Sequence, residues 1–133
     1  MKNIITILAL FFFSFGYSQA LDTLNYLKKF EIEKAKYIGK PFSALLKDMT
    51  KIQPKTMWPV RHGRYKTFIL GNSFKFCDMK FSFHNAIVLS ITWQDTVPMS
   101  DYNNLAKRNG YYFTDDEREY YSDMIIKDIQ VYR

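Results

Sequence analysis

The stretch FKFCDMKFSFHNAIVLSITW, residues 74–93, decides the fold of this chain. Apolar side chains occupy every second position of residues 87–93, which is the period of a β-strand with one buried face. We therefore predict two antiparallel strands, Phe74–Phe83 and Ala86–Trp93, joined by a tight turn at His84-Asn85.

The sequence before this hairpin alternates between strand and turn signals. Tyr65–Leu70 has a period of two and is predicted as a strand, with Gly71-Asn72 as the turn that follows it. The apolar phase slips in the next strand, which predicts a β-bulge near Cys77-Asp78. Residues Lys51–Gly63 contain two prolines, so we expect a loop there, with a short extended edge at most.

Two helices are predicted at the start of the domain. Asp22–Lys36 is rich in helix-forming residues with apolar members at helical spacing, and Gly39 ends this helix. Pro41 begins a second helix at a position where its missing amide hydrogen costs nothing. The apolar stripe of this second helix follows the spacing i, i+3, i+4 and i+7: Phe42, Leu45, Leu46 and Met49.

The C-terminal part completes the predicted topology. We expect a helix over Ser100–Arg108 and a final strand over Ile125–Tyr132. The acidic run Asp115–Glu119 fits either one helical turn capped by Thr114 or a solvated loop. The order α-α-β-β-β-α-β predicts an α+β domain, in which an N-terminal helical hairpin precedes an antiparallel sheet of about four strands with helices on one face.

Part of this pattern resembles a known fold. The pattern G-x-x-x-x-x-L-L runs from Gly39 to Leu46, within two predicted helices that precede a three-stranded meander. Over residues 22–93 this arrangement is similar to the small periplasmic fold shared by outer-membrane assembly lipoproteins and β-lactamase-inhibitor proteins. The chain lacks the lipid-bearing cysteine of those lipoproteins and continues beyond the similar part, so the resemblance implies a fold and no functional residue.

The N-terminus carries a predicted export signal. Lys2 precedes an apolar run, residues 4–15, that is shorter than the roughly 20 residues a membrane-spanning helix needs. Small side chains before Gln19 favour cleavage at that point; a cut two residues later and a retained N-terminal anchor are the alternatives. We predict a cleaved signal peptide, residues 1–18, and one exported domain, residues 19–133, periplasmic or secreted and without a transmembrane span after cleavage.

Residues with catalytic or metal-binding chemistry are few. Cys77 is the only cysteine, so the chain forms no internal disulfide, and its apolar neighbours favour a buried thiol. The one conceivable nucleophilic set is Cys77, His84 and Asp78, but His84 fits better as a turn residue. A zinc site would draw on His62, His84, Cys77 and Asp78, of which only Cys77-Asp78 has the spacing of a ligand pair. The acidic run lacks the pattern of a calcium loop. We predict no catalytic residue, no metal and no cofactor.

The charge of the chain is unevenly distributed. Nineteen Lys and Arg against 13 Asp and Glu give a net charge of +6, and residues 28–80 hold 13 basic and 4 acidic residues. A basic surface is therefore expected on the N-terminal half, where cations alternate with aromatic residues. An anionic glycan, a lipid headgroup or an acidic protein fits such a surface, whereas export makes nucleic acid a poor candidate. The alternative is a set of lysines that only keep the protein soluble.

Two functional hypotheses follow. The favoured one is a non-enzymatic binding module that uses the loop Lys51–Tyr65, with Trp58 as an apolar anchor and with charged or polar contacts around it: Arg61, Arg64, Lys55 and Tyr65. The alternative is a small periplasmic hydrolase or ligand-binding protein with a pocket between sheet and helices. That pocket is expected to be lined by Trp93, Tyr111 and Tyr112, with a carboxylate at its mouth, either Asp95 or Asp101.

Overall fold

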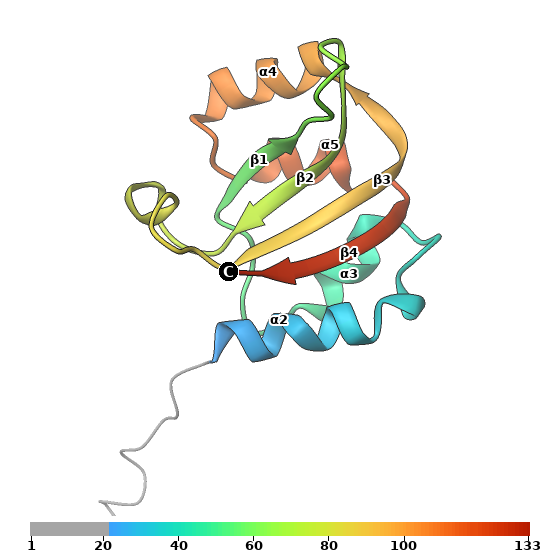
Figure 1. The fold of residues 1–133 in the computed structure, drawn as a ribbon, viewed down its shortest axis with the longest axis vertical. Coiled ribbons are helices and arrows are strands. Elements are labelled where there is room, and N and C mark those ends of the chain that lie inside the picture. Colours follow the sequence, from blue (N-terminus) through green and yellow to red (C-terminus); the bar gives the residue numbers. More distant parts are fainter. Residues whose placement is uncertain (1–21) are drawn as a thin grey trace, which may run out of the picture.

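The computed structural model describes residues 22–133, so the predicted signal peptide lies outside the described residues. Two helices come first, then three strands, two further helices and a last strand (Figure 1). No helix in this range is long and apolar enough to cross a membrane. The elements are α2 (Thr23–Ile32), α3 (Phe42–Asp48), β1 (Thr56–Val60), β2 (Phe68–Lys75), β3 (Val88–Pro98), α4 (Met99–Asn109), α5 (Asp115–Tyr121) and β4 (Ile126–Tyr132), with 3₁₀ turns at Lys34–Lys36 and Met79–Phe81.

The strands form one antiparallel sheet in the order β1-β2-β3-β4. This arrangement confirms the predicted α+β class, with an N-terminal helical pair followed by a four-stranded antiparallel sheet. The acidic run folds as α5, whose N-terminus carries a capping box between Thr114 and Glu117. Of the two alternatives for this run, the helical one is therefore correct.

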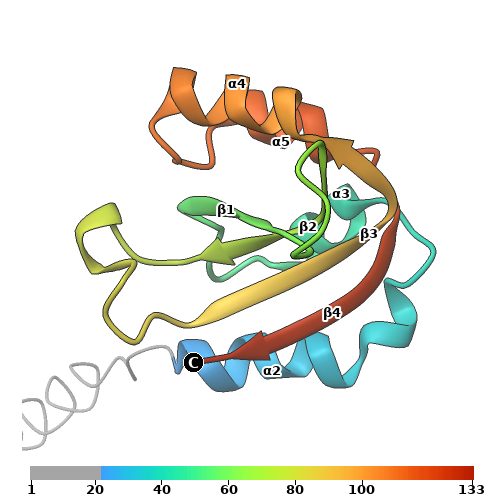
Figure 2. The same cartoon turned by 45° about the horizontal axis from the view of Figure 1, so that its top comes forward.

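The core lies on the face of the sheet that α3, α4 and α5 cover, which we call the inner face (Figure 2). Phe42 of α3 stacks on Phe74 of β2, with ring centroids 5.0 Å apart, and meets Trp93 of β3 edge-on at 5.1 Å. Tyr121 of α5 stacks on the same tryptophan at 5.5 Å. These rings join the helices to the sheet, so the high aromatic content builds the core as well as the surface.

Other segments cover part of each edge of the sheet. The segment 111–113 joins the free edge of β1 through backbone hydrogen bonds of 2.8 and 2.9 Å. At the opposite edge, the segment 39–40 exchanges backbone hydrogen bonds of 2.8 and 3.0 Å with Ile126, and Glu31 of α2 accepts the backbone N–H of Val131. These contacts reduce the number of free backbone groups that either edge offers to another strand.

Strand β2 corrects two predictions. It runs from Phe68 through Gly71-Asn72 to Lys75, so the predicted strand Tyr65–Leu70 is confirmed only in its last three residues and the turn after it is wrong. Asn72 is fully buried, and Gly71 lies against β3, where an added Cβ atom would sit 2.1 Å from the carbonyl oxygen of Ile91. Glycine at this position permits the close approach of two backbones rather than a turn.

The connection between β2 and β3 is longer than predicted. The strand Phe74–Phe83 and the tight turn at His84-Asn85 are wrong, because residues 76–87 form a loop. Phe81 and Phe83, whose spacing imitated a strand, are exposed in this loop. Alternation of apolar residues cannot by itself separate a half-buried strand from a loop that presents rings to solvent.

Two smaller corrections and one confirmation complete the fold. The irregularity in β2 lies between Ile69 and Gly71 rather than near Cys77-Asp78. The Cys77 side chain is half-buried instead of buried. The short extended edge expected within Lys51–Gly63 is confirmed: it is β1, the outermost strand of the sheet, where Pro59 is tolerated.

Candidate binding surface

A cluster of aromatic rings lies on the outer face of the sheet, opposite the core. Trp58 of β1 stacks on Tyr111, with ring centroids 4.9 Å apart and an angle of 10° between the planes. Phe83 meets the Trp58 ring edge-on at 5.2 Å. The Nζ atom of Lys75 lies 5.2 Å from the ring centroids of both Trp58 and Phe83. We call these four residues the aromatic cluster.

Three segments position the aromatic cluster. Successive side chains of a strand point to opposite faces, so Met57 enters the core and the tryptophan after it points outward. Tyr111 has a φ of +67°, a left-handed conformation that bulky residues rarely adopt, and its carbonyl accepts the backbone N–H of Met57 at 2.9 Å. Lys75 donates to the carbonyl of Ser82 at 2.5 Å, which fixes the loop that carries Phe83.

The rings of the aromatic cluster differ in exposure. Phe83 is 73% exposed and Tyr111 is 44% exposed. Trp58 is half-buried between them, and its Nε1–H donates to Oγ1 of Thr56 at 3.2 Å. An exposed group of rings around one cation offers a partner apolar contact area together with a positive charge.

The basic loop, residues 61–67, follows β1 directly. Its turn is closed by a hydrogen bond of 2.9 Å from the Tyr65 N–H to the carbonyl of His62. The Tyr65 ring stacks on Phe68 at 4.6 Å and lies 5.5 Å from the His62 ring. Three cationic side chains of this loop are exposed: Arg61, Arg64 and Lys66.

These three cations have no acidic partner within the described part of the chain. The ion pairs there join five other basic residues to carboxylates, at distances from 2.7 to 3.9 Å. Neighbouring cations without counter-charges raise the local positive potential, so the basic loop attracts anionic groups.

The predicted partner-binding residues lie in more than one place. Trp58 belongs to the aromatic cluster, whereas both arginines and Tyr65 belong to the basic loop. Lys55 points toward the loop 76–87, where its Nζ atom is 3.9 Å from Oδ1 of Asp78. The structure therefore brings Trp58 together with residues distant in sequence rather than with the cations that follow it.

Sequence reasoning missed three members of the aromatic cluster. Lys75 was part of a predicted strand, Phe83 was assigned to the same strand, and Tyr111 was assigned to a pocket. They meet Trp58 only because β2, the loop after it and the segment 111–113 converge on β1. The aromatic content of 18% was the one signal for such a surface, and it does not say which rings are exposed.

The residues predicted to line the pocket of a hydrolase or ligand-binding protein do not come together. Trp93 is 2% exposed and donates its Nε1–H to Oδ1 of Asn72 at 2.8 Å inside the core. Tyr111 lies on the outer face of the sheet, so these two rings do not line a common pocket. Of the two predicted carboxylates, Asp101 lines a hollow of about 400 Å³ between α4 and α5.

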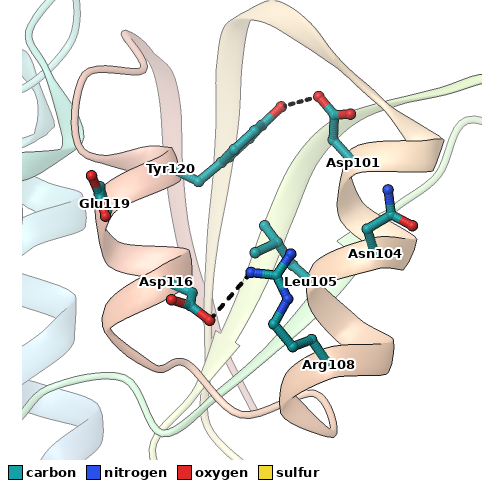
Figure 3. A pocket seen from close by; sticks show the side chains of 7 residues that line it. All are labelled: Asp101, Asn104, Leu105, Arg108, Asp116, Glu119 and Tyr120. Carbon is teal, nitrogen blue, oxygen red and sulfur yellow. Dashed lines mark hydrogen bonds and ion pairs between the residues drawn. The ribbon is translucent and has the colours of Figure 1, made fainter.

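Figure 3 shows this hollow, with α4 on one side and α5 on the other. The Tyr120 hydroxyl donates to Asp101 at 2.7 Å, and Arg108 lies 3.6 Å from Asp116. Burial and the hydrogen bond to Asp101 raise the pKa of Tyr120 to about 12. Two of the carboxylates in the hollow are therefore engaged with neighbours on the opposite helix.

The residues of the conceivable nucleophilic set are only partly brought together. Cys77 and His84 line one hollow of about 250 Å³ beside the loop 76–87, whereas Asp78 faces Lys55. No hydrogen bond joins Cys77 to His84 among residues 22–133. Within the same range, no three His, Cys, Asp or Glu side chains are grouped in a way that could hold a metal ion.

Comparisons of this chain with models of protein families, with curated proteins and with solved structures found no match. The resemblance of residues 22–93 to the periplasmic fold of assembly lipoproteins and β-lactamase-inhibitor proteins therefore stays a prediction.

Proposed function

We propose that this chain is an exported binding module whose partner carries both apolar and anionic groups. The aromatic cluster supplies the apolar contact, and the basic loop, which follows β1 in the sequence, supplies positive charge. The observation that carries the proposal is the exposed position of Phe83 and Tyr111 around Trp58 and Lys75 on the outer face of the sheet.

Interface energetics support the choice of this surface. Aromatic residues and arginine are enriched at protein interfaces, and a few of them contribute most of the binding free energy. The edges of the sheet are poorer candidates, because the segments 39–40 and 111–113 already occupy part of them. The outer face therefore offers the larger free contact area.

Export is part of the proposal and rests on the apolar run of residues 4–15. Protein recovered from the periplasm or the medium is expected to have the intact mass of a chain that begins at Gln19. A recovered chain that still begins at Met1 contradicts this part of the proposal.

Partner capture tests the proposed surface. The full chain is expressed, purified and immobilised, and proteins and glycans from the cell envelope are quantified after washing. Phe83→Ala is expected to reduce retention of a true partner by at least about tenfold, because a buried aromatic anchor contributes about 2 kcal/mol or more. The double variant Trp58→Ala plus Arg61→Ala is expected to remove it.

Ile32→Ala is the matched control, because Ile32 is 81% exposed at the end of α2, outside the aromatic cluster. The control is expected to retain the partner as the wild type does. If every captured component is retained equally by Phe83→Ala and by Ile32→Ala, the aromatic cluster is not the binding surface. Unfolding midpoints of all variants separate loss of contact from loss of fold.

A further inference from the structure

A hollow of about 430 Å³ lies between the basic loop and the first turns of α4. No side chain that lines it is acidic. Five polar side chains around it can each donate a hydrogen bond: Arg61, His62, Tyr65, Lys66 and Asn103. The first four come from the basic loop and Asn103 comes from α4, so donors stand on both walls.

Existing contacts hold these two walls together. The Met99 N–H at the start of α4 donates to the carbonyl of Thr67 at 2.8 Å. The turn from His62 to Tyr65 is closed by a backbone hydrogen bond, and the Tyr65 ring stacks on Phe68. The backbone that carries the donors is fixed by these contacts, so a ligand has mainly the exposed side chains of Arg61 and Lys66 to order.

The charge balance of the hollow is positive. Asp101, the acidic residue in the first turn of α4, lines the other hollow instead, where it accepts the Tyr120 hydroxyl (Figure 3). None of the ion pairs found between residues 22 and 133 engages Arg61 or Lys66. Both cations are therefore available to an anion.

We propose that this hollow binds a tetrahedral oxyanion, a sulfate or phosphate group. Such a group presents acceptor oxygens in several directions and can meet donors from both walls. A carboxylate has two oxygens in one plane, which a single arginine already satisfies. The inference rests on the proposed function, because it names the anionic group that the partner carries. A free inorganic sulfate or phosphate ion could occupy the same hollow.

Titration with inorganic sulfate and phosphate tests the site. Backbone amide shifts of the full chain, labelled with ¹⁵N, are followed at constant ionic strength, with sodium acetate as the comparison. Saturable shifts are expected in residues 61–67 and around Met99 and Asn103, and acetate is expected to bind at least about tenfold more weakly. Shifts that rise linearly without saturation, or acetate that binds as tightly as sulfate, overturn the proposal.

Two variants of equal charge sharpen the test. Arg61→Gln plus Lys66→Gln is expected to weaken sulfate binding by about tenfold or more, since it removes two charge-assisted donors. Lys29→Gln plus Lys40→Gln removes the same charge at exposed positions outside the hollow and is expected to bind sulfate like the wild type. Equal weakening in both double variants overturns the site, because it shows a diffuse effect of net charge.

Dextran sulfate and neutral dextran separate the two sources of the anion. Tighter binding per sulfate group to dextran sulfate than to free sulfate, lost in Arg61→Gln plus Lys66→Gln, assigns the site to an ester on a polymer. Equal binding per group assigns it to a free anion. These titrations use no natural partner, so they test the oxyanion site independently of the capture experiment. Absence of sulfate binding with partner capture through Phe83 contradicts only the oxyanion site, and the opposite pair of results contradicts only the proposed binding surface.

Discussion

At the scale of single residues, Glu117 shows how the domain holds a buried carboxylate. The side chain is 1% exposed, and a bare charge at such a position is costly unless donors surround it. It accepts the backbone N–H of Thr114 at 2.9 Å, the Thr114 hydroxyl at 2.5 Å and Nδ2 of Asn109 at 2.7 Å. The residue therefore joins the start of α5 to the end of α4.

We predict that Glu117→Ala lowers the free energy of unfolding by about 2–3 kcal/mol, because three donors lose a charged acceptor at a buried site. Glu119→Ala is the matched control on the same helix and is expected to change stability by less than about 0.5 kcal/mol. Urea denaturation measures both values. Similar losses for the two variants would show that the network around Glu117 carries no special stability.

The sequence predicted part of this network. A threonine followed three residues later by glutamate is a local capping signal, and Thr114 was named as a cap on that ground. The sequence left helix and loop open for the acidic run. The helix is stabilised by burial against α4 and by Asn109, eight residues before Glu117, which donates to its carboxylate. Local pattern alone does not contain that contact.

At the scale of elements, the close approach of β2 and β3 at Gly71 determines the register of the sheet. An added Cβ atom would lie 2.1 Å from the Ile91 carbonyl oxygen, and this neighbour is backbone that cannot turn aside. We predict that Gly71→Ala destabilises the domain by about 3 kcal/mol or more, since the two strands must separate or lose hydrogen bonds.

Gly63→Ala is the control for that substitution, because the same atom at Gly63 in the basic loop meets open space. Thermal unfolding of both variants is the measurement, and Gly63→Ala is expected to change stability by less than about 1 kcal/mol. An equally small effect at Gly71 would mean that the sheet adjusts at little cost and that its register is less constrained than its geometry indicates.

These elements also show where prediction from sequence stops. The stripe of Phe42, Leu45 and Leu46 depends on helical spacing within one segment, so α3 was predicted correctly. The pair Gly71-Asn72 has the composition of a turn, yet Ile91 and Trp93 of the neighbouring strand hold it in the sheet. Contacts between distant segments override local preference, and the aromatic cluster is assembled in the same way.

At the scale of the whole molecule, the sheet presents one face to the core and leaves the other to solvent. Helices cover the inner face, other segments bond part of each edge, and exposed rings gather at the outer face near β1. The net charge of +6 and the unpaired cations of the basic loop add a positive potential at one end of that face. Charge of this kind increases the rate at which an anionic partner arrives more than the stability of the complex.

Buried tyrosines give the domain a defined response to alkaline pH. Burial, followed by the hydrogen bond to Asp48 at 2.8 Å, raises the pKa of Tyr37 to about 12. Burial also raises the pKa of Tyr102 and of Tyr121 well above the ordinary value for a phenol. Each of these side chains is therefore held protonated in the folded state at a pH at which the unfolded chain releases the proton.

The sign of the pH dependence follows from that difference. Below the ordinary phenol pKa of about 10, both states keep the proton and the contribution to stability is complete. As pH rises from about 10 to about 12, the unfolded state loses protons first, so the free energy of unfolding falls by up to about 1.4 kcal/mol per pH unit for each such tyrosine. We predict that Tyr37→Phe makes this fall less steep, because the variant no longer has this proton to lose. Urea denaturation at a series of pH values, with tyrosinate absorbance as a second readout, measures the slopes; a free energy of unfolding that stays constant through this interval would show that the buried phenols are not coupled to folding.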